Sequence, residues 1–453
     1  MSAVDRSRRP SSGPIRNFDF PAVDRRSLPN GLDLRVARMS RLPVVSLKLF
    51  MRGGEAALSA ERGGLGVLTG DALEGGTKRR SGTELAEALE RIGARLNVSV
   101  GWEGTSLGLS CLADRLPEAL ALLAETLLEP AFPDDEVQRA LEQHLAGIRQ
   151  RAKDPAALAS DAASARYFAS TVPYARPVDG VADTFVHVTR KELIGYADAS
   201  YRPQGGGLIV VGDVDAGEVE AMAREQLGAW TGAPAPVADF AVEPAARERR
   251  VWIVDRPGSV QSEIRVGHVG VARDTPDYFG LAISNMVLGG MFTSRLNLNL
   301  RERHGFTYGV RSLFAYRSQP GFFQVSTSVG NEVTGPAVRE ILTEIEAMAD
   351  TGPTDDEVAA ARDYAAGVFG LHLETASDVA TRVSQLVVYG LRDDYYRDYR
   401  DAVRSVSREH AAEAAKRHVR PAESQIVVVG DASQIAAPLE ALELGPVEVL
   451  PAG

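Results

Sequence analysis

An arginine and a tyrosine close together in the sequence form the strongest candidate for a functional pair. Arg301 lies near the end of a helix-compatible run, residues 294–302, and Gly305 lets the chain turn before Tyr308. A guanidinium offers several fixed donors and a phenol offers one O–H on a rigid ring. Such a pair can hold and polarise a carbonyl or carboxylate, but neither group breaks bonds alone. The alternative is an ordinary helix end with an exposed arginine and a core tyrosine.

No other group of nucleophiles, acids, bases or metal ligands stands out. The seven histidines are scattered, and none belongs to a His-Glu-x-x-His sequence or its inverse. His304 is expected to be solvated or bonded to the backbone beside the turn. Asp71 and Glu74 would share a polar helix face that contacts water. Cys111 lies among alternating apolar residues, which indicates a buried strand residue rather than a nucleophile.

Length and composition indicate a globular protein with two or more domains. The chain has 453 residues, 44% of them apolar and 25% charged, which is too long for one hydrophobic core. Its formal net charge of −11 argues against nucleic acid or an anionic membrane as the main partner. No stretch reaches the roughly 18 apolar residues of a membrane span. The single cysteine excludes an internal disulfide.

The first 25 residues are expected to form a disordered arm, because arginines lie there among serines and prolines. The arm has no apolar stretch like that of a secretory signal. Pro10, Pro14 and Pro21 would interrupt the amphipathic helix of a transit peptide. We therefore expect a cytoplasmic protein.

The folded part begins with strand and helix patterns that come in runs. Residues 28–31, Leu-Pro-Asn-Gly, predict a turn between short strands, the second of them at 44–51. Ser81 and Glu84 form a capping box for an amphipathic helix that Gly93 ends. Further elements are expected as strands at 95–100 and 105–111 and as helices from about 117 and 134. Such runs favour an α+β fold with antiparallel sheet over a doubly wound one.

An internal repeat divides the chain into two similar halves. Arg202-Pro203, an apolar strand and Gly212-Asp213 recur as Arg420-Pro421 with Gly430-Asp431, at an offset of 420 − 202 = 218 residues. The sequence Asp-Asp-Glu-Val also opens a helix in both halves, at 134–137 and 355–358. Two matches in the same order predict one architecture built twice. We expect domains at 26–230 and 251–453 with a Pro/Ala-rich linker at 231–250.

Together with the repeat, a series of short motifs makes the chain resemble the insulinase/pitrilysin (M16) family of zinc peptidases in its short, two-domain form. The family implies two homologous α+β domains, the LuxS/MPP-like metallohydrolase fold, enclosing a cleft for unfolded peptides. The resemblance covers nearly everything after the arm. It is carried by motifs that are weak singly and specific in this order: Leu28 to Leu32, Gly64-Leu65, Gly76-Thr77, Val172 to Tyr174, Gly180, Val188 to Arg190, Asp255 to Gly258, Gln261-Ser262, Ser294 to Leu296, Arg301 and Tyr308.

The metal-binding motif of the family is missing. Active members carry His-x-x-Glu-His on a helix between the Gly-Leu and Gly-Thr motifs, where the histidines bind zinc and the glutamate activates water. Aligned on those motifs, the histidine positions fall on Val67 and Asp71 and the glutamate on Gly70. The third ligand, a glutamate shortly before an Asp-Pro, falls on Gly147. The resemblance therefore implies a degenerate metal site, with no zinc or other cofactor bound by this chain.

We therefore expect a non-catalytic, substrate-binding subunit of a heteromeric M16-type peptidase. In two-chain members of the family one subunit carries zinc, and its partner contributes an arginine and a tyrosine that match Arg301 and Tyr308. The resemblance implies a homologous partner with an intact His-x-x-Glu-His and bound zinc, and an unfolded peptide as substrate. Two alternatives stay open: a structural scaffold such as the related core subunits of respiratory complexes, and a self-sufficient hydrolase with an unrecognised site.

Overall fold

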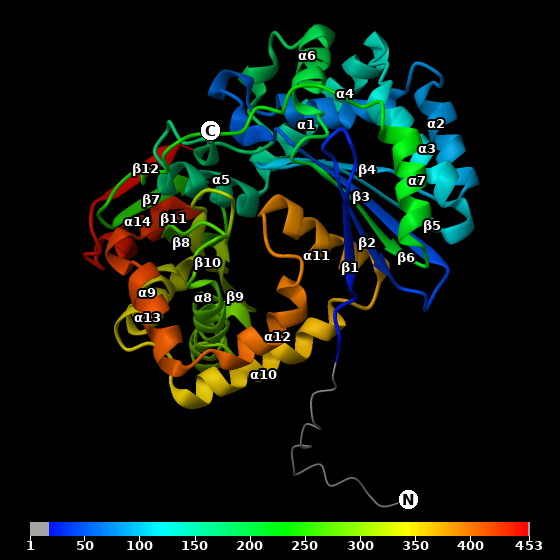
Figure 1. The fold of residues 1–453 in the computed structure, drawn as a ribbon. Helices are drawn as coiled ribbons and strands as arrows, with labels where there is room; N and C mark the ends of the chain where they lie inside the picture. The colour runs from blue at the N-terminus through cyan, green and yellow to red at the C-terminus, as the bar shows by residue number, and fades with distance from the viewer. Residues whose placement is uncertain (1–17, 452–453) are drawn as a thin grey trace, which may run out of the picture.

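Two six-stranded sheets organise the computed structural model, which describes residues 18–451 (Figure 1). The first sheet has the order β1-β2-β6-β3-β5-β4 and the second β12-β7-β11-β8-β10-β9. The first is built from β1 (Val23–Ser27), β2 (Asp33–Arg38), β3 (Val44–Arg52), β4 (Asn97–Val100), β5 (Gly104–Leu112) and β6 (Gly207–Gly212). The second is built from β7 (Arg250–Asp255), β8 (Gln261–Val269), β9 (Val310–Ala315), β10 (Phe322–Gly330), β11 (Gln425–Gly430) and β12 (Val447–Pro451).

Each half of the chain also contributes α-helices. The first half contains α1 (Leu65–Ala72), α2 (Gly82–Arg91), α3 (Leu116–Leu128), α4 (Asp134–Lys153), α5 (Pro155–Tyr167), α6 (Arg190–Ser200) and α7 (Ala216–Leu227). The second contains α8 (Tyr278–Asn285), α9 (Thr334–Asp350), α10 (Asp355–Leu371), α11 (Ala376–Val388), α12 (Tyr395–Ser405), α13 (Arg408–His418) and α14 (Ala432–Glu440). Between α7 and β7 no helix forms.

Five of the six strands are connected in the same way in the two halves, and the edge strands differ, since β1 pairs antiparallel with β2 and β12 pairs parallel with β7. β6 pairs parallel with β2 and antiparallel with β3, while β11 pairs parallel with β7 and antiparallel with β8. β3 and β5 then match β8 and β10, both antiparallel pairs, and the repeated Asp-Asp-Glu-Val opens α4 and α10. The prediction of two homologous α+β domains is confirmed. The exact seam between them stays a prediction.

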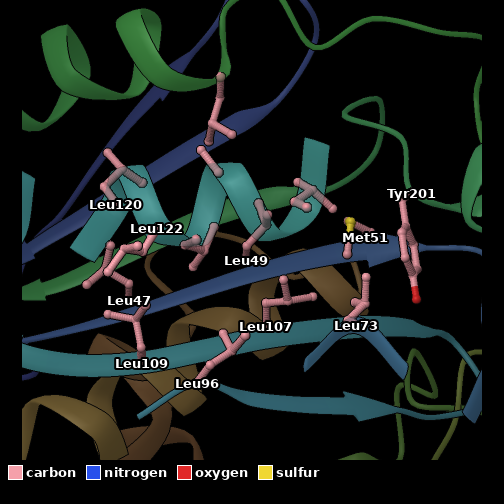
Figure 2. Packing of buried hydrophobic residues seen from close by; sticks show 14 of the residues in the cluster. Leu47, Leu49, Met51, Leu73, Leu96, Leu107, Leu109, Leu120, Leu122 and Tyr201 are labelled. Carbon is pink, nitrogen blue, oxygen red and sulfur yellow. The ribbon is translucent and has the colours of Figure 1, made fainter. Parts of the chain in front are cut away.

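Alternation along β3 and β5 places two sets of side chains on opposite faces of the sheet. Leu47 and Leu49 of β3 and Leu107 and Leu109 of β5 belong to one buried cluster with leucines of α3 (Figure 2). Because successive strand side chains point to opposite faces, the residues between them, including Lys48, belong to the other face of the sheet.

One helix of each half packs against the sheet of the other half. α11 contacts β3 and β6 of the first sheet, and α5 contacts β8 and β11 of the second, so both helices lie between the sheets (Figure 1). Phe50, Ile209 and Val211 pack there against α11 residues such as Val383 and Leu386. Separating the halves would expose apolar surface on both sheets, and this exchange therefore holds them together.

The N-terminal segment differs in part from the expected arm. Residues 1–17 lie outside the described part of the chain. Phe20, however, is buried, with its ring centroid 5.3 Å from that of Tyr396, and β1 begins at Val23. The folded chain thus begins before residue 26, because the second half offers Phe20 an apolar contact. Among residues 18–451 no helix combines the length and apolar character needed to cross a membrane.

Candidate functional site

The positions aligned with the family's metal site lie on two helices that pack together. Val67, Gly70 and Asp71 are on α1, and Gly147 is on α4. Gly70 is buried against β4, where a Cβ would lie 2.8 Å from Val100 Cγ2. Gly147 is exposed, with no atom within 4 Å of the place of a Cβ. Of the four aligned residues only Asp71 has a side chain that could bind zinc, so these positions do not fit the metal.

A histidine that sequence reasoning passed over contacts this degenerate site. His144 of α4 places Nδ1 3.3 Å from Asp71 Oδ2 and Nε2 2.8 Å from the carbonyl oxygen of Asp179. Burial opposes the charge on the ring, but the contacts with Asp71 and Asp179 raise the pKa of His144. Both partners are acceptors, so a protonated ring donates from both nitrogens. The two partners lie 73 and 35 residues away in sequence, and no local pattern indicates them.

Glu55 is the second residue that the sequence did not indicate, and its carboxylate caps the N-terminal end of α1. Its carboxylate is fully buried and accepts the N–H groups of Gly64 and Gly66, both at 2.8 Å, and of Val67 at 3.2 Å. Burial raises the pKa of Glu55, and these amides and Arg176 partly offset that effect. The first N–H groups of a helix lack partners inside it and carry partial positive charge, which a carboxylate satisfies. Glu55 therefore stabilises the helix that bears the degenerate site.

Arg301 and Tyr308 occupy the predicted junction in the second half. Arg301 lies in the π-helical segment Asn297–Arg303, and the turn that follows has Gly305 at a φ of +65°. Tyr308 precedes β9 and is 96% exposed, so it is not a core tyrosine. The Arg301 guanidinium lies 4.4 Å from the ring centroid of Phe292, which is itself 66% exposed. Tyr308 thus faces solvent, whereas the Arg301 side chain is 34% exposed and its Nε lies 3.5 Å from Glu302 Oε1.

The element that carries Arg301 is anchored to its surroundings. Just before it, Arg295 forms a bidentate ion pair with Glu357 of α10, at 2.7 and 2.6 Å. Asn297 donates from Nδ2 to the carbonyl of Val310 at 2.9 Å and accepts the Val310 N–H at 3.1 Å. These contacts fix both ends of the turn between the helix and β9. Arg301 and Tyr308 therefore stand on a rigid base, as a positioning site requires.

The remaining candidate residues from the sequence are either buried in the core or exposed to solvent, and they form no catalytic group. Cys111 is buried in β5, where burial raises the pKa of its thiol to about 11. His304 is exposed and stacks on Phe306 at 4.9 Å. Asp71 and Glu74 are both exposed, although Asp71 also contacts a histidine. Within residues 18–451 no cluster of three or more His, Cys, Asp or Glu side chains could hold a metal ion.

Zinc analysis tests the degenerate site. Purified protein, dialysed after addition of one equivalent of zinc, is expected to retain well under one equivalent, because Val67 and Gly147 offer no lone pair. Asp71 and His144 alone are too few ligands. Wild type, Asp71→Ala and His144→Ala should give the same low value. One equivalent held by the wild type and lost in either variant would overturn this prediction.

Family models and curated relatives agree with the motifs. Residues 40–175 match the model described as insulinase (peptidase family M16), and residues 187–364 match the peptidase M16 inactive domain. A protein of Mycobacterium tuberculosis named as an uncharacterized zinc protease is 26% identical over 370 residues, 80% of this chain and 83% of that protein. One of the same description from Bacillus subtilis is 22% identical over 366 residues, 80% and 87% of the two chains.

Solved structures show the same architecture. The crystal structure of a peptidase M16 inactive domain from Pseudomonas fluorescens gives a TM-score of 0.84 at 26% identity, covering 90% of this chain and 97% of that one. A protease from Helicobacter pylori gives 0.83 at 18% identity, covering 90% and 99%, which shows the fold alone. Models, relatives and duplicated fold agree, and the chain therefore belongs to the M16 (insulinase) family of peptidases.

Proposed function

We propose that this chain is a non-catalytic, substrate-binding subunit of a heteromeric M16-type peptidase. In this proposal it supplies Arg301 and Tyr308 to the zinc site of a homologous partner. The observation that supports it is the contrast between the two halves. The metal positions on α1 and α4 keep only Asp71 as a ligating side chain, whereas Tyr308 is exposed and Arg301 part-exposed on an anchored turn.

The chemistry of the pair suits peptide hydrolysis at a neighbouring metal. The partner's zinc supplies a Lewis acid and an activated water. Tyr308 donates its O–H to the substrate carbonyl oxygen, which gains negative charge as water attacks. Arg301 holds nearby peptide carbonyls with its planar set of donors and counters the developing charge. Both residues act as hydrogen-bond donors throughout the reaction.

The exposure of Tyr308 and Phe292 supports the proposal of a second chain. Donors that face water contribute little to transition-state stabilisation, because the solvent competes for the same acceptors. Tyr308 at 96% and Phe292 at 66% exposure are left uncovered by this chain's own residues. A partner that covers this surface would exclude water from the pair. The isolated chain is therefore expected to be inactive.

A structural scaffold is the second candidate function. A scaffold homologue needs neither metal ligands nor a presented Arg/Tyr pair, so the missing ligands are compatible with it. The anchored turn with its exposed Tyr308 favours the peptidase subunit. Cytoplasmic location, and the absence of nucleic acid and membrane among the main partners, stay predictions.

Co-expression tests the proposal. This chain is to be produced with a homologue from the same organism that carries an intact His-x-x-Glu-His. We expect a joint peak in size-exclusion chromatography and cleavage of quenched unfolded peptides only by the pair. A pair whose homologue has its motif glutamate changed to glutamine should assemble without cleavage. Full activity of the homologue alone would contradict a contribution from this chain.

A further inference from the structure

We propose that a pocket around Lys48, on the face of the first sheet that α11 partly covers, binds the carboxylate side chain of an extended peptide. This inference rests on the proposed function and deepens it, because it names an acidic peptide segment as the substrate class. The pocket has a volume of about 250 Å³. The residues that matter to its chemistry are Ser46, Lys48, Ser99, Ser106, Ser110 and Ser377.

Strand pairing builds the pocket from small polar residues. Lys48 of β3 lies opposite Gly108 of β5, and Ser46 lies opposite Ser110. β4 adds Ser99 opposite Ser106 of β5. These residues alternate with the leucines of the first core, so they share the opposite face. α11 covers the part of this face over β3 and β6, and the part over β5 and β4 is left as a polar pocket beside Ser377.

Lys48 is the only charged residue among the described residues that line the pocket. Its Nζ donates to Thr381 Oγ1 of α11 at 2.6 Å, and among the described residues it forms no ion pair within 4.0 Å. Asp378 is the acidic residue whose charge interacts with the Lys48 ammonium group. That carboxylate already caps α11, accepting the Thr375 hydroxyl at 2.6 Å. Burial lowers the pKa of Lys48, so an anion brought beside it would be stabilised.

Size and lining favour a carboxylate side chain over a cofactor. Pockets for drug-sized ligands occupy roughly 300–1,000 Å³, and this one is smaller. No aromatic side chain lines it, so it offers no stacking surface for a nucleotide base. The serine hydroxyls can each donate one hydrogen bond to a carboxylate oxygen beside the ammonium group. Gly108 and the serines have the smallest side chains among the lining residues, which leaves room beside Lys48 for a carboxylate side chain.

Direct peptide binding by the isolated chain tests the proposal. The probes are two peptides with fluorescein on the N-terminal amine, fluorescein-(Ala)3-Glu-(Ala)3-amide and the same peptide with Gln in place of Glu. Fluorescence polarisation should give a Kd about ten-fold lower for the Glu peptide, the scale of one charge-assisted hydrogen bond. Lys48→Met should remove the preference. Lys191→Met, at an exposed lysine of α6, is the matched control and should keep it.

A second pair of variants leaves Lys48 and its contact with α11 intact. A Cβ at Gly108 would lie 3.8 Å from Lys48 Cγ and 3.7 Å from the Leu47 carbonyl oxygen, which are ordinary contacts. Gly108→Asp would place a carboxylate beside Lys48 and abolish the preference for Glu, whereas the isosteric Gly108→Asn should retain it. Equal affinity of the wild type for both peptides, or a preference that survives in Lys48→Met or Gly108→Asp, would overturn the proposal.

The binding result and the co-expression result can fail separately. Binding is measured without a partner, so a chain that selects Glu but never activates a homologue would keep the carboxylate pocket and lose the proposed function. A pair that cleaves peptides although this chain binds Glu and Gln peptides equally would keep the function and lose the pocket.

Discussion

Tyr308→Phe in the assembled pair is expected to lower kcat about a hundred-fold or more without loss of assembly. Removal of one oxyanion donor typically costs roughly 10²–10³ in kcat. Tyr308 is 96% exposed, so loss of its hydroxyl removes no core packing. Arg301→Lys should lower kcat as well, because a point charge cannot replace a planar guanidinium that stacks on Phe292.

Steady-state cleavage of a quenched peptide by wild-type and variant pairs measures the effect, and size-exclusion chromatography checks assembly separately. The matched control is Tyr364→Phe, which removes the hydroxyl of another exposed tyrosine, on α10. It should cleave at the wild-type rate. Wild-type rates in both Tyr308→Phe and Arg301→Lys would show that the pair has no part in catalysis and would favour the scaffold.

Much of the fold could be predicted because its signals are local. Ser81 and Glu84 form the predicted capping box of α2, and the predicted turn at residues 28–31 joins β1 to β2 as an antiparallel hairpin. The strand expected to follow that turn, at 44–51, is instead β3, and β2 comes between them. The duplication could be read from short matches, since both copies need the same strand and helix starts. The exchange of α5 and α11 could not be predicted. An amphipathic pattern shows that a helix face is buried, but not which sheet buries it.

The candidate site, too, could be predicted only where its signals are local in the sequence. The turn at Gly305 is confirmed at a φ of +65°, because a glycine between a helix and a strand has a local conformational meaning. The contact of Arg301 with Phe292 and the outward direction of Tyr308 depend on packing across the turn. His144 and Glu55 were missed since their partners come from other elements, as the contact between His144 and the Asp179 carbonyl shows.

Glu55→Ala is expected to destabilise the first half of the molecule by about 3 kcal/mol or more, the scale of breaking a buried charged contact. The wild-type carboxylate accepts the amide N–H groups of Gly64, Gly66 and Val67 and lies 3.6 Å from Arg176. Alanine would leave those donors buried without an acceptor at the start of α1. Glu55→Gln should recover only part of the loss, because its NH2 group would face the same amide donors.

Thermal and urea unfolding of the isolated chain, followed by circular dichroism, measures this effect. A two-domain protein can unfold in more than one step, so hydrogen exchange of the α1 amides identifies the half that is affected. The expected fall in the melting temperature is roughly 6 °C or more. Glu61→Ala, at an exposed glutamate nearby, is the matched control and should stay within about 0.5 kcal/mol of the wild type. If Glu55→Ala unfolds like that control, the carboxylate is not what holds α1 in place, and the contact with His144 on α4 becomes the stronger candidate for that role.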